Sequence, residues 1–177
     1  MGAGPHLVLV GLMGAGKTTV GERCAAVLGR PFVDTDEVIE ATAHLTVAEI
    51  FERFGESHFR ALERQVVADV AASPAALVIA CGGGAVLDAG SRQVLRDAGV
   101  VVWLRASTAA LEARVGAGDT RPLLRGGAAP ALARLATDRA EVYRAVAHVT
   151  VDTSERTVEE AADAVLEAAR GSDTWSA

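Results

Sequence analysis

The chain has 177 residues and half of them are hydrophobic, a size and composition that suit one globular domain and exclude a disordered chain. Its formal net charge of −6, from 17 basic and 23 acidic side chains, argues against nucleic acid as a partner, because such grooves need clustered Lys and Arg. No apolar run approaches the ~18 residues of a membrane-spanning helix, and Cys24 and Cys81 fit buried reduced thiols, so we expect a cytoplasmic protein without a membrane partner.

Short apolar runs alternate with helical stretches along the chain. In chain order the pattern predicts a strand over 7–10, a helix over 17–28, a strand over 32–34, helical pieces over 36–73, strands over 77–81 and 100–104, helices from 107 and over 131–145, a strand over 148–151 and a helix over 158–169. This alternation predicts an α/β fold, a three-layer α/β/α sandwich around a five-stranded parallel sheet. One domain is expected over 1–170, followed by a disordered tail over 171–177.

A glycine-rich loop joins the first predicted strand to the first helix. Residues 11–18 read Gly-Leu-Met-Gly-Ala-Gly-Lys-Thr, which matches the Walker A pattern in full. Glycines let backbone amides converge on phosphate oxygens, and the helix that follows directs its positive end at the anion. Lys17 would place a cation near the β and γ phosphates, and the Thr18 hydroxyl can coordinate Mg²⁺. The alternative is a chance glycine-rich turn. We predict that the loop binds the phosphates of ATP, or of a close relative, through Gly14, Ala15, Gly16, Lys17, Thr18 and Thr19.

Three further patterns each have a structural and a functional interpretation. Asp34 and Asp36 would share one side of a strand end, where open α/β sheets bind ligands, although Asp36 could instead cap the next helix. Arg60 lies off the apolar stripe of its helix and one turn from Glu63, which fits either a surface ion pair or an arginine held toward a ligand. Three glycines at 82–84 form either a tight turn or a place of close backbone approach to a ligand.

Glycines at both ends of residues 116–127 are typical of a mobile lid. A kinase needs such a lid, because water competes with the acceptor hydroxyl for the transferred phosphoryl group. Arg121 within this segment would arrive on closure and stabilise the charge of the transferring phosphate. An ordinary flexible loop is the alternative interpretation.

The motifs, taken together and in this order, resemble the shikimate kinase family, which has the nucleoside monophosphate kinase-like P-loop fold. The resemblance covers nearly the whole chain. It rests on the Walker A loop, Asp-Thr-Asp at 34–36, Phe59-Arg60 with Glu63, the glycines at 82–84, Arg-Pro-Leu-Leu at 121–124, and Arg139 followed by Tyr143.

The resemblance implies roles for the acceptor end of the site. Asp34 would lie near the Mg²⁺ site with Thr18, and Asp36 would bind substrate hydroxyls and serve as the candidate base. Arg60 and Arg139 would grip the shikimate carboxylate, with substrate-binding helices over about 36–62. Gly82, Gly83 and Gly84 would line the substrate pocket.

At the nucleotide end, the resemblance places Arg114 and Arg156 around adenine. The family often has a proline shortly after the second arginine, where this chain has Thr-Val-Glu at 157–159. Lys17, Asp36 and Arg121 would be the catalytic residues, and Mg²⁺ the metal that accompanies ATP.

The activity implied by the resemblance is transfer of the ATP γ-phosphoryl group to the 3-hydroxyl of shikimate. The products would be shikimate 3-phosphate and ADP, in chorismate and aromatic amino acid biosynthesis, and the protein would be a monomer with small-molecule substrates only. A related P-loop kinase such as gluconate kinase and a non-catalytic nucleotide-binding module remain alternatives.

Overall fold

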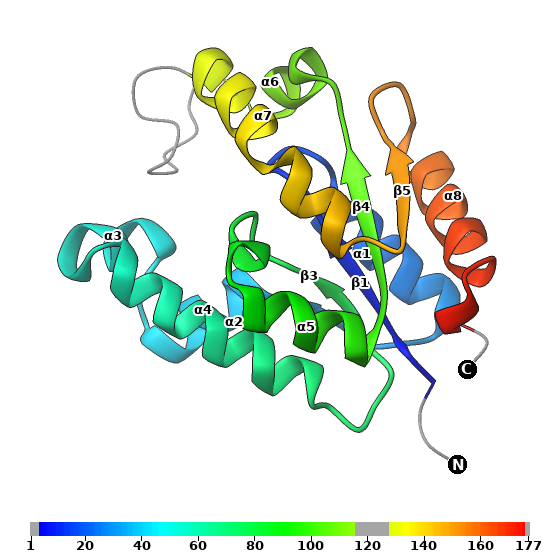
Figure 1. Cartoon of the computed structure of the whole chain (residues 1–177), viewed down its shortest axis with the longest axis horizontal. Helices are drawn as coiled ribbons and strands as arrows, with labels where there is room; N and C mark the ends of the chain where they lie inside the picture. Colours follow the sequence, from blue (N-terminus) through cyan, green and yellow to red (C-terminus); the bar gives the residue numbers. More distant parts are fainter. Residues whose placement is uncertain (1–3, 116–127, 176–177) are drawn as a thin grey trace.

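The computed structural model describes residues 4–115 and 128–175, and it contains one five-stranded parallel sheet in the order β2-β3-β1-β4-β5 (Figure 1). The predicted fold class is confirmed. The strands are β1 (His6–Val10), β2 (Phe32–Asp34), β3 (Val78–Ala80), β4 (Gly99–Arg105) and β5 (Val149–Asp152). The helices are α1 (Lys17–Leu28), α2 (Thr35–Ala43), α3 (Val47–Phe54), α4 (Glu56–Ala71), α5 (Ala89–Ala98), α6 (Thr108–Val115), α7 (Ala128–Val146) and α8 (Val158–Arg170), with short 3-10 turns η1 (Ala85–Leu87) and η3 (Asp173–Trp175).

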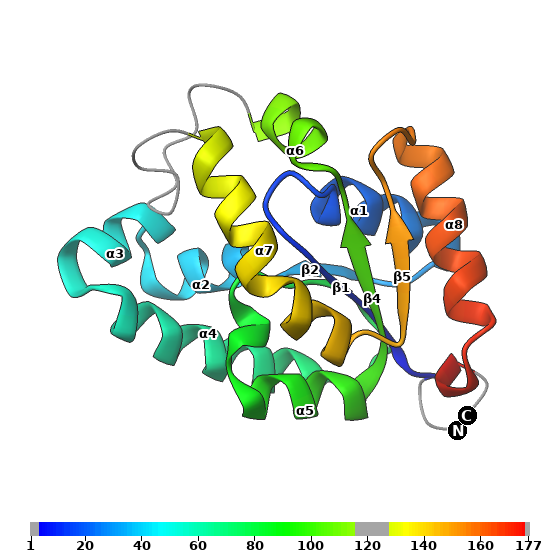
Figure 2. The ribbon, with the colours of Figure 1, turned by 45° about the horizontal axis from the view of Figure 1, so that its top comes forward.

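Helices cover both faces of the sheet. α1 and α8 pack together on one face, while α5 and α7 lie on the other (Figures 1 and 2). Strand β1 lies in the middle of the sheet and all five of its residues are buried, which explains its continuous apolar run. No helix among the described residues is long and apolar enough to span a membrane.

The strand register brings the loops of the site to one edge of the sheet. Asp34 at the end of β2 and Leu9 of β1 both pair with Ala80 at the end of β3, and Arg105 of β4 pairs with Asp152 at the end of β5. The segments that follow these strands therefore emerge side by side at the carboxyl edge, which is where open parallel sheets bind ligands.

Helices α2, α3 and α4 form a lobe with its own small core beside the β2 edge (Figure 2). That core consists of Ile39, Ile50, Phe59 and Val66. The predicted capping box at Thr46 and Glu49 starts α3. A cavity lies at the carboxyl edge of the sheet, and this separately packed lobe forms one of its walls.

Two parts of the chain differ from the sequence-based expectation. Helix α5 was not predicted, because its apolar positions are few, and it is started by Asp88, whose carboxylate accepts the Ser91 N–H at 2.8 Å. A disordered tail was expected over 171–177; the structure describes this segment as far as residue 175, and Asp173–Trp175 form η3. There the Arg30 guanidinium lies 4.7 Å from the centre of the Trp175 ring, a cation–π contact. The predicted lid at 116–127, with Arg121, lies outside the described residues.

His148 just before β5 makes stability depend on pH. Its Nδ1 accepts the Val101 N–H at 3.0 Å, a bond that requires a neutral ring. Burial, and then the charge of Arg96, lower the pKa of His148 in the folded protein. The stabilisation is therefore complete above the unfolded value of about 6.5 and is lost as the pH falls below it.

We expect the melting temperature of the wild type to fall as the pH is lowered from 7.5 to 5.5. His148→Asn keeps an amide oxygen that can accept the same N–H but does not titrate. It should reduce that fall by about 2–4 °C, the equivalent of one hydrogen bond. Thermal melts of both proteins across this pH range make the measurement. Equal pH slopes for wild type and His148→Asn would contradict the assignment.

Candidate active site

The backbone of the glycine-rich loop has the shape that phosphate binding requires. Gly11, Gly14 and Gly16 adopt positive φ angles of 146°, 79° and 97°, a region that side chains disfavour. A side chain at Gly11 would also place its Cβ 2.4 Å from the Leu104 carbonyl oxygen. Helix α1 begins at Lys17, directly after the loop, so the positive end of the helix faces the same space.

One cavity of about 810 Å³ lies at the carboxyl edge and collects most of the predicted site residues. The predicted site residues that line it are those of the phosphate loop, the two aspartates and six others: Gly14, Ala15, Gly16, Lys17, Thr18, Thr19, Asp34, Asp36, Arg60, Gly83, Gly84, Arg114, Arg139 and Arg156. Gly82 packs behind the carboxylates of Asp36 and Glu63. Arg121 lies outside the described residues. The sequence therefore predicted residues that the fold brings to one place.

Asp34 and Asp36 both line the cavity while Thr35 does not, as predicted, but strand alternation is not what places them there. The reason given was wrong, because the strand ends at Asp34 and α2 begins at Thr35. Asp34, rather than Asp36, caps the helix, since its Oδ1 accepts the Asp36 N–H at 3.0 Å. Thr35 turns inward, is fully buried, and accepts the Gly82 N–H at 2.9 Å. The cap leaves Asp36 on the cavity wall.

Thr18 and Asp34 form a hydroxyl–carboxylate pair beside the phosphate loop. The Thr18 hydroxyl donates to Asp34 Oδ2 at 2.9 Å, which places two hard oxygen ligands next to one another. The described residues contain no cluster of three or more His, Cys, Asp or Glu that could hold a metal. A Mg²⁺ ion bound through nucleotide phosphates needs only one or two protein oxygens, so the pair present fits that ion.

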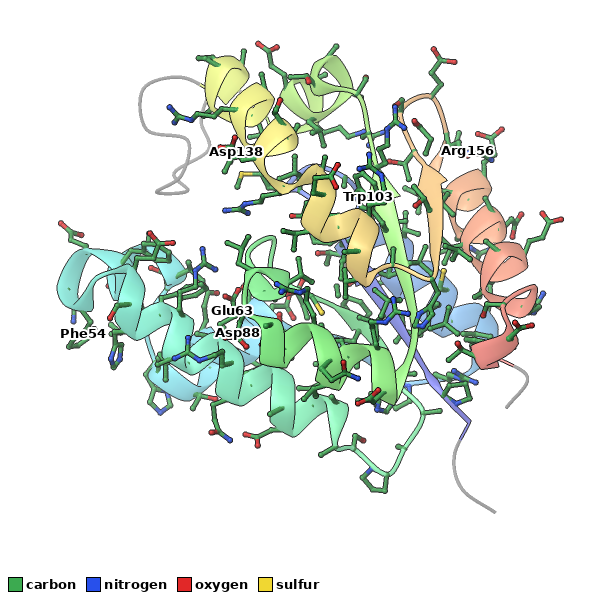
Figure 3. All side chains as sticks on the ribbon, in the orientation of Figure 1. Phe54, Glu63, Asp88, Trp103, Asp138 and Arg156 are labelled. Carbon is green, nitrogen blue, oxygen red and sulfur yellow. The ribbon has the colours of Figure 1, made fainter. Side chains whose placement is uncertain are left out.

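Arg60 on α4 is fixed by two carboxylates. Its Nη1 donates to Glu63 Oε2 at 2.6 Å, and its Nη2 donates to Glu56 Oε1 at 3.1 Å. Glu63, on α4 beside η1, is only 3% exposed, so this is not the surface ion pair that the sequence left open (Figure 3). Burial raises the pKa of Glu63, and the charges of Arg60 and Arg139 oppose that rise. Burial alone would lower the pKa of Arg60, but Glu63 and Glu56 raise it.

The three glycines at 82–84, which follow β3, each contact a different charged side chain. A Cβ at Gly82 would lie 2.5 Å from Asp36 Oδ1, and a Cβ at Gly84 would lie 2.1 Å from Arg60 Nη1. Gly83 instead offers its carbonyl oxygen, which accepts from Arg139 on α7. Gly82 and Gly84 therefore make room for charged side chains, and Gly83 and Gly84 also line the cavity, so the predicted close approach of this backbone to a ligand stays a prediction.

Arg139 is an ordinary helix residue by sequence pattern and a buried one by structure. It is 6% exposed, and its Nη1 donates to the Gly83 carbonyl at 2.9 Å. Tyr143, one turn further along α7, donates to the same oxygen at 2.6 Å, and burial raises the pKa of Tyr143 to about 12, so the phenol stays protonated. These two bonds connect α7 to the glycines at 82–84, next to Arg60.

The nucleotide end of the cavity holds the other two predicted arginines. Arg156, in the loop between β5 and α8, donates from Nε to the Asp152 carbonyl at 2.9 Å (Figure 3). Arg114 on α6 donates to the Gly14 carbonyl at 3.2 Å and also to Thr153. Thr153 lines the cavity and was missed, because a single threonine after a strand carries no local signal of a distant partner.

An apolar wall of the cavity was also missed. Val47 and Phe51 on α3 and Phe59 on α4 face the cavity, and the Phe51 and Phe59 rings are 4.8 Å apart. The amphipathic pattern of α3 was a signal for this wall, although core packing explains the same pattern. Apolar surface opposite charged groups suits a small acceptor with one hydrocarbon face.

The fold and this cavity define a P-loop kinase with a site for a small-molecule acceptor. A family model described as shikimate kinase matches residues 13–170. A shikimate kinase from Symbiobacterium thermophilum is 47% identical over 165 residues, which cover 92% of this chain and 94% of that protein. The chain belongs to the shikimate kinase family.

Solved structures agree with this placement. Shikimate kinase from Acinetobacter baumannii, in complex with shikimate, superposes with a TM-score of 0.89 at 39% identity, covering 92% of this chain and 91% of that one. A gluconokinase from Sinorhizobium meliloti reaches a TM-score of 0.57 at 18% identity, covering 95% of this chain and 93% of its own, a likeness that shows the fold alone.

Proposed function

We propose that the chain is an ATP-dependent shikimate kinase, which converts shikimate and ATP to shikimate 3-phosphate and ADP in the biosynthesis of chorismate and the aromatic amino acids. One observation carries the proposal. The same cavity is lined by a Walker A loop, by two largely buried arginines, Arg60 and Arg139, and by the carboxylate of Asp36. A hydroxy acid is the acceptor that such a pair of arginines and a carboxylate would recognise, because guanidinium forks match carboxylates and a carboxylate accepts from a hydroxyl.

In the proposed reaction, Arg60 and Arg139 hold the shikimate carboxylate while Asp36 accepts the proton of the 3-hydroxyl. The hydroxyl oxygen forms a bond to the γ-phosphorus as the bond from that phosphorus to the bridging oxygen breaks, and ADP leaves. The amides of the loop 11–18 and the Lys17 ammonium bind the phosphates. Most of the acceleration then comes from positioning and electrostatic stabilisation.

The metal part of the proposal concerns Thr18 and Asp34. These two side chains would hold Mg²⁺, directly or through water, as their 2.9 Å pairing and oxygen chemistry permit. When bound with ATP, this ion neutralises charge on the β and γ phosphates. We also place Arg121 among the residues that stabilise the transferring phosphate, and Arg114 and Arg156 around adenine.

The test is a coupled assay of ADP release over a panel of hydroxy acids that includes shikimate, quinate and gluconate. We expect release that depends on shikimate, with at least about a hundredfold lower kcat/KM for gluconate, because a site built for particular hydroxyls rejects analogues that leave its polar groups unpaired. Gluconate-dependent release would favour the related kinase, and ATP binding without turnover on any acceptor would favour a non-catalytic module. Lack of shikimate-dependent ADP at every pH from 6 to 9 would reject the proposal.

We further propose a cytoplasmic monomer. Both cysteines, Cys24 and Cys81, are buried free thiols, and burial raises the pKa of Cys24 to about 12, which suppresses the reactive thiolate. Light scattering on the purified protein would test the oligomeric state, since a dimer would double the measured mass from 18.2 kDa.

A further inference from the structure

We propose that Thr153 and Arg114 are positioning residues that hold the peptide between Ala15 and Gly16 in the orientation that binds phosphate. This inference rests on the proposed role of the loop 11–18 in binding ATP. It assigns Arg114 a second role besides its proposed place near adenine. It also gives Thr153 a part in the reaction, although Thr153 touches neither substrate in the proposed scheme.

Thr153 joins the end of the sheet to the phosphate loop. It follows β5 directly, is 2% exposed, and its backbone N–H donates to the Arg105 carbonyl at 2.8 Å. Its hydroxyl donates to the Ala15 carbonyl at 3.0 Å, whereas its distance to the Arg105 carbonyl is 3.4 Å. A hydroxyl has one proton, so the shorter contact with Ala15 is the principal bond. The strand thus fixes a donor opposite the phosphate loop.

Arg114 completes the connection from α6. Its Nη1 donates to the Gly14 carbonyl at 3.2 Å and to the Thr153 hydroxyl at 3.2 Å. Its Nη2 donates to the carbonyls of Thr153 and Ser154. One guanidinium therefore bonds both the phosphate loop and the segment after β5, and the Thr153 hydroxyl lies between them as acceptor and donor.

Peptide planarity turns these contacts into an effect on phosphate binding. The Ala15 carbonyl and the Gly16 N–H belong to one planar trans peptide, so they point in opposite directions. A donor that fixes the carbonyl toward Thr153 fixes the Gly16 N–H away from Thr153. The preceding peptide is held in the same manner, since the Ala15 N–H donates to the Leu12 carbonyl at 3.1 Å while Arg114 binds the Gly14 carbonyl.

The loop needs such restraint because its glycines permit the alternative. Gly14 and Gly16, on either side of Ala15, have positive φ angles of 79° and 97°, and glycine populates positive and negative φ about equally. Without a donor on the Ala15 carbonyl, this peptide can rotate and present an oxygen where phosphate requires an N–H. The apparent affinity for ATP then falls by the fraction of molecules in the competent orientation.

The experiment compares Thr153→Val, which removes the hydroxyl and keeps the shape, with Thr153→Ser, which keeps the hydroxyl. We expect Thr153→Val to raise the ATP Kd, measured by calorimetry without shikimate, and the ATP KM by about tenfold, with the KM for shikimate at saturating ATP unchanged. Thr153→Ser should stay within about twofold of wild type. Thr150→Val, the same change at an exposed position of β5, is the matched control and should leave all constants unchanged.

Thermal melts accompany each variant, and Thr153→Ala replaces Thr153→Val if the latter does not fold. An ATP Kd of the folded variant within twofold of wild type would overturn the inference. So would an equal rise in the KM values of both substrates, which would indicate a general structural role. Because the calorimetry does not use turnover, it tests Thr153 even if the wild type lacks shikimate-dependent activity and the proposed function fails.

Discussion

Replacing Asp36 with Asn is expected to lower kcat by about 10²–10⁴-fold, the usual contribution of a positioned general base. The amide keeps the size of the carboxylate and one oxygen that can accept from the acceptor hydroxyl. It cannot take the proton, so binding should persist while the phosphoryl transfer slows. Steady-state rates at saturating ATP and shikimate, with the KM of each substrate, provide the measurement.

Asp97→Asn on α5 is a matched control for this change. Asp97 is exposed and accepts from Gln93 on the same helix at 2.8 Å, and its substitution should leave kcat unchanged. If Asp36→Asn retained kcat within tenfold of wild type, the role of base would have to pass to another group. If it instead raised both KM values with kcat intact, Asp36 would be a binding residue only.

The second large effect is expected for Arg60→Ala, which should raise the KM for shikimate by about a hundredfold and the KM for ATP by less than about threefold. Arg60 lines the cavity beside Gly84 and has no part in the proposed nucleotide binding, so its loss should affect one substrate. Kinetics with each substrate varied at saturation of the other give both constants. A similar rise in the two KM values would contradict the role of Arg60 in carboxylate binding.

Two further variants separate the lost ligand contact from lost structure. Arg60→Ala leaves the buried Glu63 without its principal cation, so its melting temperature should fall, and assays belong well below that temperature. Arg60→Lys keeps a charge opposite Glu63 but loses the planar fork, and should raise the shikimate KM by an intermediate factor. Arg53→Ala removes an exposed pair with Glu49 on α3 and should change neither KM.

The sequence predicted the features that depend on residues close together in the chain, such as the phosphate loop, the bounds of two elements and one helix cap. The apolar run before Gly11 and the helix from Lys17 specify the phosphate loop, and the observed bounds of α1 and β2 are those expected. Capping at Thr46 was also predictable, because its two partners are three residues apart. Helix α5 was missed because its apolar residues are few, although Asp88 caps it and it packs against α4 and β4.

Contacts between distant residues could not be predicted from a single chain. Thr153 and Ala15 are separated by 138 residues, and the pairing of β5 with β4, and of β4 with β1, brings them together. The sequence predicted correctly that Asp34 and Asp36 lie on the same side, but for the wrong reason. The strand does not continue past Asp34, and a helix capped by Asp34 begins there instead. The resemblance supplied roles for Arg60 and Arg139 that neither spacing nor burial patterns would have favoured.

Four crowded glycines differ in what an added methyl group would meet, and therefore in the genetic effect expected of alanine. At Gly11 and Gly99 the methyl group would strike backbone atoms, at 2.4 Å and 2.1 Å, so alanine there damages the fold itself. At Gly82 and Gly84 the nearest atoms belong to the side chains of Asp36, Glu63 and Arg60, so alanine there disarranges the acceptor site and displaces the Arg60–Glu63 pair. Alleles of the second kind would combine a lower melting temperature with a damaged site. Protein abundance alone would then underestimate their effect on fitness.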